Sequence, residues 1–389
     1  MGVHLVPRRP QPSLRLARLL ALCLALASTQ CAPARPPHAA PLRAAESPAD
    51  PLRFIENDLP AARALAIRQH KLLVVDAWAP WCHTCLSMRA FVFPDPSLRP
   101  LARHVVFAAI DTDQPSSADF LDSYPVHVWP SLFILHPASG DVLAYWPGSC
   151  SAQELRTLVD DAVRVADATA PVGVPLRDLT DARGALAARD LERAQHGFAR
   201  LLARMNPSWS RWTEALTGAI ETLRAAGSFP ACADFGAAHL REVSGASRPG
   251  DFAAMTLDCA ARLPPGQQRS AVEKAAIAML RDLVNAPAPH ASVDDRPDLL
   301  GILADDLESS GDHAAALQMH EQRIAMLEQA AAEASTPRAA STFDYLLARS
   351  YVAIGRGQDA VRLLAAHELH CGGAEMRCRS LAPKWDEWV

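Results

Sequence analysis

Two cysteines separated by two residues follow closely after a short aliphatic run, and this arrangement constrains the fold more than any other feature. The four residues from Leu72 to Val75 are all aliphatic, which predicts a strand buried on both faces of a sheet. A helix is expected to begin at Cys82 and to run to about Phe91. A thiol in the first turn of a helix lies beside unpaired backbone N–H groups, which favour the thiolate. Cys82 is therefore a candidate reactive thiol, and Cys85 a candidate for the thiol that resolves a mixed disulfide.

The residues on both sides of this motif alternate between strand and helix patterns. Asn57 or Asp58 can cap a helix whose first turn contains a proline. Ser151 and Glu154 have the spacing of a capping box, which marks the start of an amphipathic helix. We expect one α/β domain over residues 52–166. Its expected elements are helices at 58–70, 82–91 and 151–165 and strands at 72–75, 105–110, 131–135 and 142–146.

The stretch from Asp76 to Cys85, with Trp81 directly before the first cysteine, resembles the active-site turn of the thioredoxin family. The resemblance covers about residues 54–165. It implies that Cys82 is an exposed nucleophile, that Cys85 is a buried resolving thiol, and that Asp76 is a buried acid that exchanges a proton with Cys85. Burial would raise the pKa of such a carboxyl. The alternative for Asp76 is an ordinary acid at the end of a strand.

A second segment, Trp129-Pro130 before the strand at 131–135, resembles the cis-proline loop of the same family. That loop faces the active site, pairs its backbone with an extended substrate and keeps metal ions away from the thiols. By this likeness Pro130 orients the substrate. Trp129 replaces the more usual small or β-branched residue, and we expect it to shape substrate access. Trp81 and His83 are further candidates for substrate binding.

The chain also departs from the family pattern. Phe107 lies about where many thioredoxins carry a buried lysine near the acid, so Asp76 is expected to be tuned by burial alone. Ala90 lies about where a helix-kinking proline is common. The cysteine motif and residues 93–96 are more similar to those of exported thiol:disulfide interchange proteins than to those of cytosolic thioredoxin. His83, if charged, would stabilise the Cys82 thiolate and make the disulfide more oxidising. The alternative for His83 is an exposed histidine with little effect.

The N-terminus predicts export. Arginines precede a short apolar run, and the pattern over residues 1–27 is typical of a signal peptide. Residues 28–51 are rich in proline and alanine and predict a disordered tether. Cys31 is a candidate for lipidation, so we expect an exported protein that is periplasmic or held at the membrane as a lipoprotein. No other segment is long and apolar enough to predict a membrane span.

The remaining cysteines fit structural roles, because disulfides persist in an oxidising compartment. Chain order suggests the pairs Cys232–Cys259 and Cys371–Cys378. Cys150 is left over, either as a free thiol or as a partner of Cys31. No metal site is expected, because structural zinc needs four ligands and no second pair with this spacing exists. No coherent ligand spacing was found among histidines 136, 239, 313, 320, 367 and 370.

Beyond a linker at residues 167–176, only helical periodicity is found, and residues 177–389 predict an all-α domain. A loose internal repeat resembles tetratricopeptide-type helical hairpins, in which a tight turn joins two helices. The alternative is an irregular helical bundle. The predicted fold is thus an α/β thioredoxin-like domain followed by an all-α, helical-repeat-like domain. The repeat sets are Ala185, Arg189, Ala194 and Phe198; Leu223, Gly227, Cys232 and Gly236; Leu307, Gly311, Ala316 and His320; and Tyr351, Gly355, Ala360 and Leu364.

These features predict a thiol–disulfide oxidoreductase that acts on protein thiols without a cofactor. Its helical domain would bind the client protein or a redox partner protein, since stacked helical hairpins form concave surfaces. A formal net charge of −5 gives no reason to expect a nucleic-acid partner. Contact with a membrane is expected only through a lipid on Cys31. The alternative is a non-catalytic binding or assembly protein whose cysteine pair stays oxidised.

Overall fold

The structure is a computed structural model that describes residues 52–167, 169–286 and 293–370. The expected signal peptide, tether and lipidation site at Cys31 lie outside these residues, as does the pair Cys371–Cys378. Among the residues described, no helix combines the length and the hydropathy that a membrane span requires.

A mixed five-stranded sheet lies in the N-terminal part of the described chain, with strand order β1-β3-β2-β4-β5. The first three strands in this order are parallel, whereas β4 is antiparallel to β2 and to β5. In the central strand Val75 lies opposite Ala108 on one side and Phe133 on the other. The strands are β1 (Phe54–Glu56), β2 (Leu72–Trp78), β3 (Val105–Asp111), β4 (Ser131–Leu135) and β5 (Val142–Pro147).

The helices α1 and α4, which pack on the sheet, begin at the N-cap residues that the sequence predicts. Asp58 accepts a hydrogen bond from the backbone N–H of Ala61 at the start of α1. Ser151 and Glu154 form the complete capping box of α4. The short elements β1, η2, η3 and α3 were not predicted, because three to eight residues carry too little periodicity. The α/β helices are α1 (Leu59–Gln69), α2 (His83–Ser87), η1 (Met88–Val92), η2 (Pro96–Arg103), η3 (Pro115–Ser117), α3 (Ala118–Ser123) and α4 (Ala152–Ala166).

The helix expected over residues 82–91 is present but is not uniform. It begins as α2 and continues as a π-helical turn, η1. The backbone N–H of Phe93 donates to the carbonyl of Met88, five residues earlier, which is the π pattern. This wider turn occupies the region of Ala90, where a kinking proline is common in related domains.

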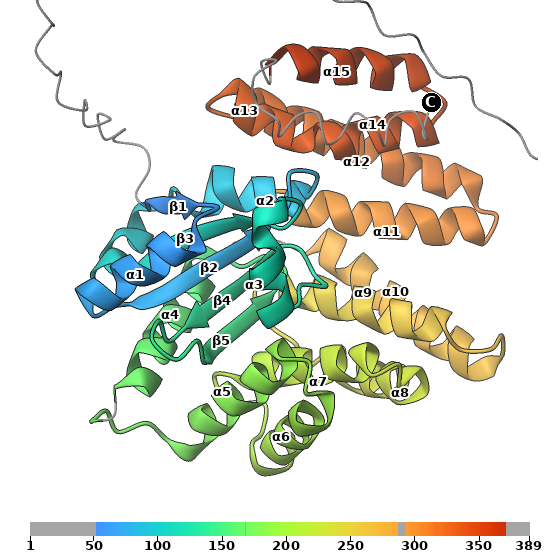
Figure 1. The fold of residues 1–389 in the computed structure, drawn as a ribbon. Coiled ribbons are helices and arrows are strands. Elements are labelled where there is room, and N and C mark those ends of the chain that lie inside the picture. The colour runs from blue at the N-terminus through green and yellow to red at the C-terminus, as the bar shows by residue number, and fades with distance from the viewer. Residues whose placement is uncertain (1–51, 168, 287–292, 371–389) are drawn as a thin grey trace, which may run out of the picture. The chain divides into compact units, whose positions relative to one another are not determined.

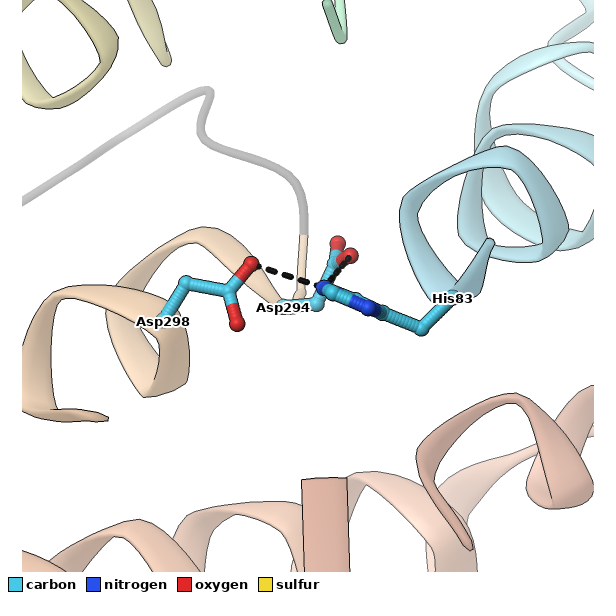
Figure 2. A group of neighbouring side chains, drawn as sticks. All are labelled: His83, Asp294 and Asp298. Carbon is cyan, nitrogen blue, oxygen red and sulfur yellow. Dashed lines mark hydrogen bonds and ion pairs between the residues drawn. The ribbon is translucent and has the colours of Figure 1, made fainter. Parts of the chain in front are cut away.

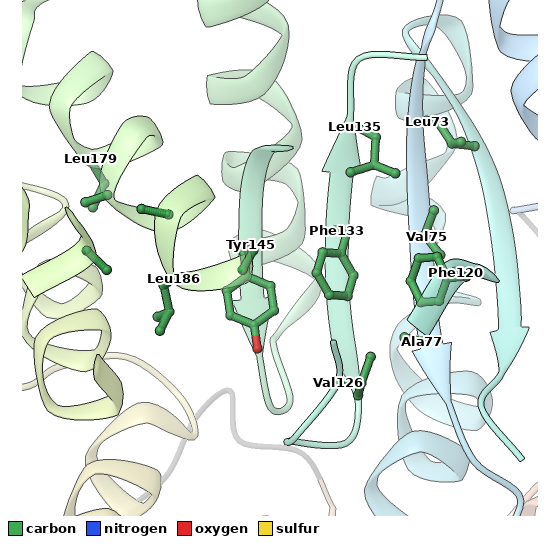
Figure 3. Packing of buried hydrophobic residues seen from close by; sticks show 14 of the residues in the cluster. Leu73, Val75, Ala77, Phe120, Val126, Phe133, Leu135, Tyr145, Leu179 and Leu186 are labelled. Carbon is green, nitrogen blue, oxygen red and sulfur yellow. The ribbon is translucent and has the colours of Figure 1, made fainter. Parts of the chain in front are cut away.

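Strand residues alternate between two apolar layers. Leu73, Val75 and Phe133 lie on the face that packs against α1 and α5, and Leu72 and Val74 lie on the face covered by α4 and η2. Figure 3 shows Tyr145 of β5 between Phe133 and the α5 side chains Leu179 and Leu186. The first helix of the C-terminal region therefore shares a core with the sheet.

The rest of the described chain is all helical, as predicted (Figure 1). Its first helix, α5, begins at Val174, inside the segment expected to be a linker. The helices are α5 (Val174–Ala187), α6 (Leu191–Arg204), α7 (Trp212–Ala225), α8 (Phe229–His239), α9 (Arg248–Ala261), α10 (Gln267–Asn285), α11 (Asp295–Ser309), α12 (His313–Glu333), α13 (Pro337–Ala340), η4 (Ser341–Phe343), α14 (Asp344–Ala353) and α15 (Gly357–His370).

The loose internal repeat has a physical basis in the turns between helices. Its second positions are Arg189, Gly227, Gly311 and Gly355, and all four have a positive φ, between 60° and 84°. Each lies between two successive helices, where a left-handed residue ends the first helix and lets the chain reverse. The repeated spacing therefore reflects a repeated helix–turn–helix geometry.

Candidate active site

The cysteine pair lies just beyond the end of β2, at the start of α2. Cys82 is the N-cap residue of this helix, and its Sγ accepts a hydrogen bond from the backbone N–H of Cys85 at 3.0 Å. The two cysteines form a disulfide with a Cα–Cα distance of 5.2 Å. When the disulfide is open, the same N–H can stabilise a thiolate on Cys82, because charge-assisted hydrogen bonds are the stronger ones.

Cys82 is not the exposed residue that the resemblance implied. It is 5 % exposed, and Cys85 is 1 % exposed. Trp81 and Trp129 pack against the small cluster that contains both cysteines. Cys82 nevertheless lines a cavity.

Asp76 is buried in the middle of the sheet, 1 % exposed, between Ala109 on β3 and Leu132 on β4. Burial raises the pKa of Asp76 to about 6, although the guanidinium of Arg89 opposes this shift. The Nε atom of Arg89 lies 3.6 Å from Oδ2 of Asp76. An acid with this pKa can exchange a proton near neutral pH.

Arg89 corrects the expectation that burial alone tunes Asp76. It belongs to η1 and its guanidinium carbon lies 4.0 Å from the ring centroid of Trp78. It also pairs with Glu56 at 3.1 Å, and the charge of Glu56 raises the pKa of Asp76 further. The cation beside Asp76 lies on η1 and not at the strand position of Phe107, so comparison with the family pattern at that position did not predict it.

The loop before β4 faces the cysteine pair. The Trp129–Pro130 peptide bond is cis, and the carbonyl of Pro130 accepts a hydrogen bond from the N–H of Gly148 at 2.8 Å. The indole N–H of Trp129 donates to Oγ1 of Thr112 at 2.8 Å, and the rings of Trp129 and Trp81 lie 5.3 Å apart. Both tryptophans line the cavity that contains Cys82.

Residues 59–163 match the family model described as a thioredoxin-like domain. The chain therefore contains a thioredoxin-like domain with a Cys82–Cys85 pair, followed by a long helical region. The comparison with curated proteins found no match.

His83 of the thioredoxin-like domain binds residues of the helical region. Its Nε2 lies 2.9 Å from Oδ2 of Asp298 and 4.0 Å from Oδ2 of Asp294 (Figure 2). Its ring stacks on Tyr345 with the centroids 5.9 Å apart. Burial lowers the pKa of His83, but the two carboxylates outweigh burial and the net change is upward. His83 is thus neither exposed nor isolated, since 22 % of its side chain is accessible.

The carboxylates around His83 have the spacing of a small metal-binding group. Ligand atoms of His83, Asp294 and Asp298 all lie within 4.8 Å of one another. Arg323 lies beside them, however, with Nη2 at 3.5 Å from Oδ1 of Asp298. Its positive charge compensates one carboxylate at the place where a cation would bind. This group was not predictable from ligand spacing, because the two acids lie more than 200 positions from His83 in the chain.

Two more contacts join the helix of the cysteine motif to the helical region. The hydroxyl of Ser87 donates to Oδ1 of Asp294 at 2.7 Å. The ring of Phe91 stacks on that of Phe343, with centroids 5.8 Å apart. The environment of the thiols therefore includes residues from α11, η4 and α14 as well as from the thioredoxin-like domain.

The other cysteines of the described chain are a second disulfide and one free thiol. Cys232 on α8 and Cys259 on α9 form a disulfide. Cys150 is a buried free thiol, and burial raises its pKa, so it is a poor nucleophile.

Proposed function

We propose that this protein is a thiol–disulfide oxidoreductase that acts on protein thiols outside the cytoplasm. The observation that carries the proposal is the Cys82–Cys85 disulfide at the start of α2, in a domain that also buries Asp76 with a pKa of about 6. A redox-active pair needs a stabilised first thiolate and a proton acceptor for the second thiol. Both are available from this chain.

The reaction consists of two exchanges. In the reduced protein the Cys82 thiolate attacks a substrate disulfide, an S–S bond forms to the nearer sulfur, and the other sulfur leaves as a thiolate. Asp76, ionised at neutral pH, then accepts the proton of Cys85. The Cys85 thiolate attacks Cys82, which releases the second substrate thiol and forms the protein disulfide. The reverse sequence oxidises two substrate thiols, and neither direction needs a cofactor.

Two features support a location outside the cytoplasm. The N-terminal sequence has the pattern of a signal peptide, with Cys31 as a lipidation candidate. The Cys232–Cys259 disulfide joins the two helices α8 and α9, and such bonds persist in oxidising compartments. We propose a periplasmic protein, soluble or lipid-anchored, whose helical region contacts the client or a redox partner.

The test is the redox equilibrium of the Cys82–Cys85 pair in the full chain, measured against glutathione by alkylation and mass spectrometry. We expect a potential between about −120 and −270 mV, the range of exchange proteins. In Cys85→Ala, Cys82 should react with iodoacetamide at pH 7 at least tenfold faster than a cysteine in an unstructured peptide. Cys82→Ala with Cys85 retained is the matched control and should react slowly.

The alternative is a binding or assembly protein that uses both domains as a scaffold, and the low exposure of Cys82 favours it. In that case the disulfide would be permanent, with a potential below about −300 mV. Cys85→Ala would then accumulate no mixed disulfides with other proteins. Such a pair of results would contradict the oxidoreductase proposal.

A further inference from the structure

The helical region and the cysteine motif together line a half-open cavity of about 800 Å³. Cys82, His83 and Trp129 line one side of it. The opposite walls come from α7, α9, α11, α12 and α14, through residues such as Glu221, Asp251, Leu299, Arg323 and Arg349. The reactive sulfur is therefore reached through a space bounded by both parts of the chain.

Specific contacts join the helical region to the thioredoxin-like domain on two sides of the cysteine motif. On one side, Asp298 binds His83 and Asp294 binds Ser87. On the other side, Nη1 of Arg248 donates to the carbonyl of Pro147 at 3.0 Å. The guanidinium carbon of Arg248 also lies 3.7 Å from the ring centroid of Trp146.

The size of this cavity limits what can enter. Cavities that bind small molecules enclose roughly 300–1,000 Å³, whereas a folded domain of 100 residues has a radius of gyration of about 13 Å. A short extended segment of chain fits a space of about 800 Å³, and a folded domain does not. A cysteine on the surface of a folded protein would have to approach Cys82 past the helical walls.

The chemistry of the lining suits a peptide. Arg248 is 4 % exposed and Arg323 is 5 % exposed, and the Nε atom of each has no hydrogen-bond partner in the described structure. Both residues line the cavity, so they place buried hydrogen-bond donors in its wall. Six arginines and six carboxylates line the cavity in all, a balance that suits a peptide with both donors and acceptors rather than a polyanion.

We infer that the substrate of Cys82 is a cysteine, as thiol or disulfide, in a short extended peptide, and that the helical region forms the second wall of its binding site. This inference rests on the proposed exchange function. The extended peptide is either an unfolded stretch of a protein or a low-molecular-weight peptide thiol. Arg248 and Arg323 are the specificity-determining residues of the helical wall.

The test uses the full chain with Cys85→Ala and three disulfide substrates that carry the same nitrothiobenzoate leaving group. The first is a Glu-Cys-Gly tripeptide, the second an unstructured ten-residue peptide, and the third the same ten residues in an exposed loop of a folded protein. Attack forms a bond between Cys82 Sγ and the substrate sulfur, breaks the substrate S–S bond and releases the coloured thiolate. We expect the two peptides to react at least tenfold faster than the folded protein.

The two peptides distinguish the source of the substrate. A faster reaction with the ten-residue peptide supports an unfolded protein segment, and a faster reaction with the tripeptide supports a small peptide thiol. Equal rates for the folded protein and the ten-residue peptide would overturn the inference while leaving the exchange function intact. Slow reaction with all three substrates and with iodoacetamide would instead overturn the exchange function.

Substitutions in the wall provide a second measurement. Ala254 on α9 lines the cavity and is half-buried, so Ala254→Trp should fill part of the space and slow both peptides by tenfold or more. Ala278→Trp on α10, at an exposed position that does not line the cavity, is the matched control and should change neither rate.

Arg323→Met should reduce the peptide rate at least threefold relative to the rate with hydroxyethyl disulfide, which has no peptide acceptors. Because the substrate comparison needs no wall substitution, it tests the inference even if Ala254→Trp fails to fold.

Discussion

His83 and Asp298 are 215 positions apart in the chain, yet Nε2 of the imidazole lies 2.9 Å from the Asp298 carboxylate. His83 separates Cys82 from the rest of the CXXC motif, and Asp298 lies in the first turn of α11. The helical region therefore raises the pKa of the side chain beside Cys82. The surroundings of the cysteine pair include helices that follow the thioredoxin-like domain.

The first prediction concerns the pH dependence of this ion pair. Its carboxylates raise the pKa of His83 above 6.5, so the charged pair stabilises the fold at low pH and loses its contribution as pH rises through the folded value. His83→Gln should lower the free energy of unfolding by about 1 kcal/mol at pH 6 and by less at pH 9. Urea unfolding at both pH values measures this. His313→Gln removes the exposed pair with Glu308 and should have little effect at either pH.

The second prediction concerns the stability cost of the buried acid. Because burial raises the pKa of Asp76 from 3.8 to about 6, stability is lost as pH rises through this interval. Asp76→Asn should therefore raise the free energy of unfolding at pH 7.5 by about 3 kcal/mol, with no gain at pH 4. Asp111→Asn is the control. The buried Asp111 carboxylate accepts a hydrogen bond from the backbone N–H of Asp113, so its replacement should not raise the free energy of unfolding. Equal unfolding energies for Asp76→Asn and the unsubstituted protein at pH 7.5 would contradict the assignment.

The third prediction separates the two charges near Asp76. The Arg89 guanidinium lowers the pKa of Asp76 and the Glu56 carboxylate raises it. Arg89→Met should therefore move the Asp76 titration upward from about 6, by about one pH unit, and Glu56→Gln should move it downward. Carbon-13 NMR of the labelled carboxyl follows both shifts directly. Movement in the same direction for both variants would show that structural change, rather than charge, controls this acid.

The fourth prediction concerns the disulfide between α8 and α9. Cys232 and Cys259 are separated by 27 positions, and closing a loop of this length stabilises a fold by about 3.5 kcal/mol in the chain-entropy account. The double substitution Cys232→Ala/Cys259→Ala should lower the unfolding free energy by about this amount under oxidising conditions. In excess dithiothreitol the difference from the unsubstituted protein should disappear. A difference that persists in dithiothreitol would assign the loss to packing instead of the bond.

Several features of the fold were predictable because they depend on neighbours in the sequence. The capping box of Ser151 and Glu154 and the cap at Asp58 are decided within one helical turn. Strand β4 has the predicted bounds, and β2 and β3 extend slightly beyond theirs, since apolar runs mark buried strands. The positive φ at Gly227 and its equivalents likewise follows from short spacings in the chain.

The tertiary structure decided what the sequence left open. A short strand such as β1 exists because β3 offers it a hydrogen-bonding edge, and α5 lies on Tyr145 although its start falls in a predicted linker. Arg89, Asp298 and Arg323 have the sequence pattern of ordinary charged residues on solvated helices. Their roles depend on which side chain lies within a few ångströms, and electrostatic and packing energies depend on that distance in space rather than on separation along the chain. Residues close together in the chain are therefore enough to predict the cysteine pair and the strand and helix that hold it. The pKa and the burial of His83 depend instead on distant helices that fold against this scaffold.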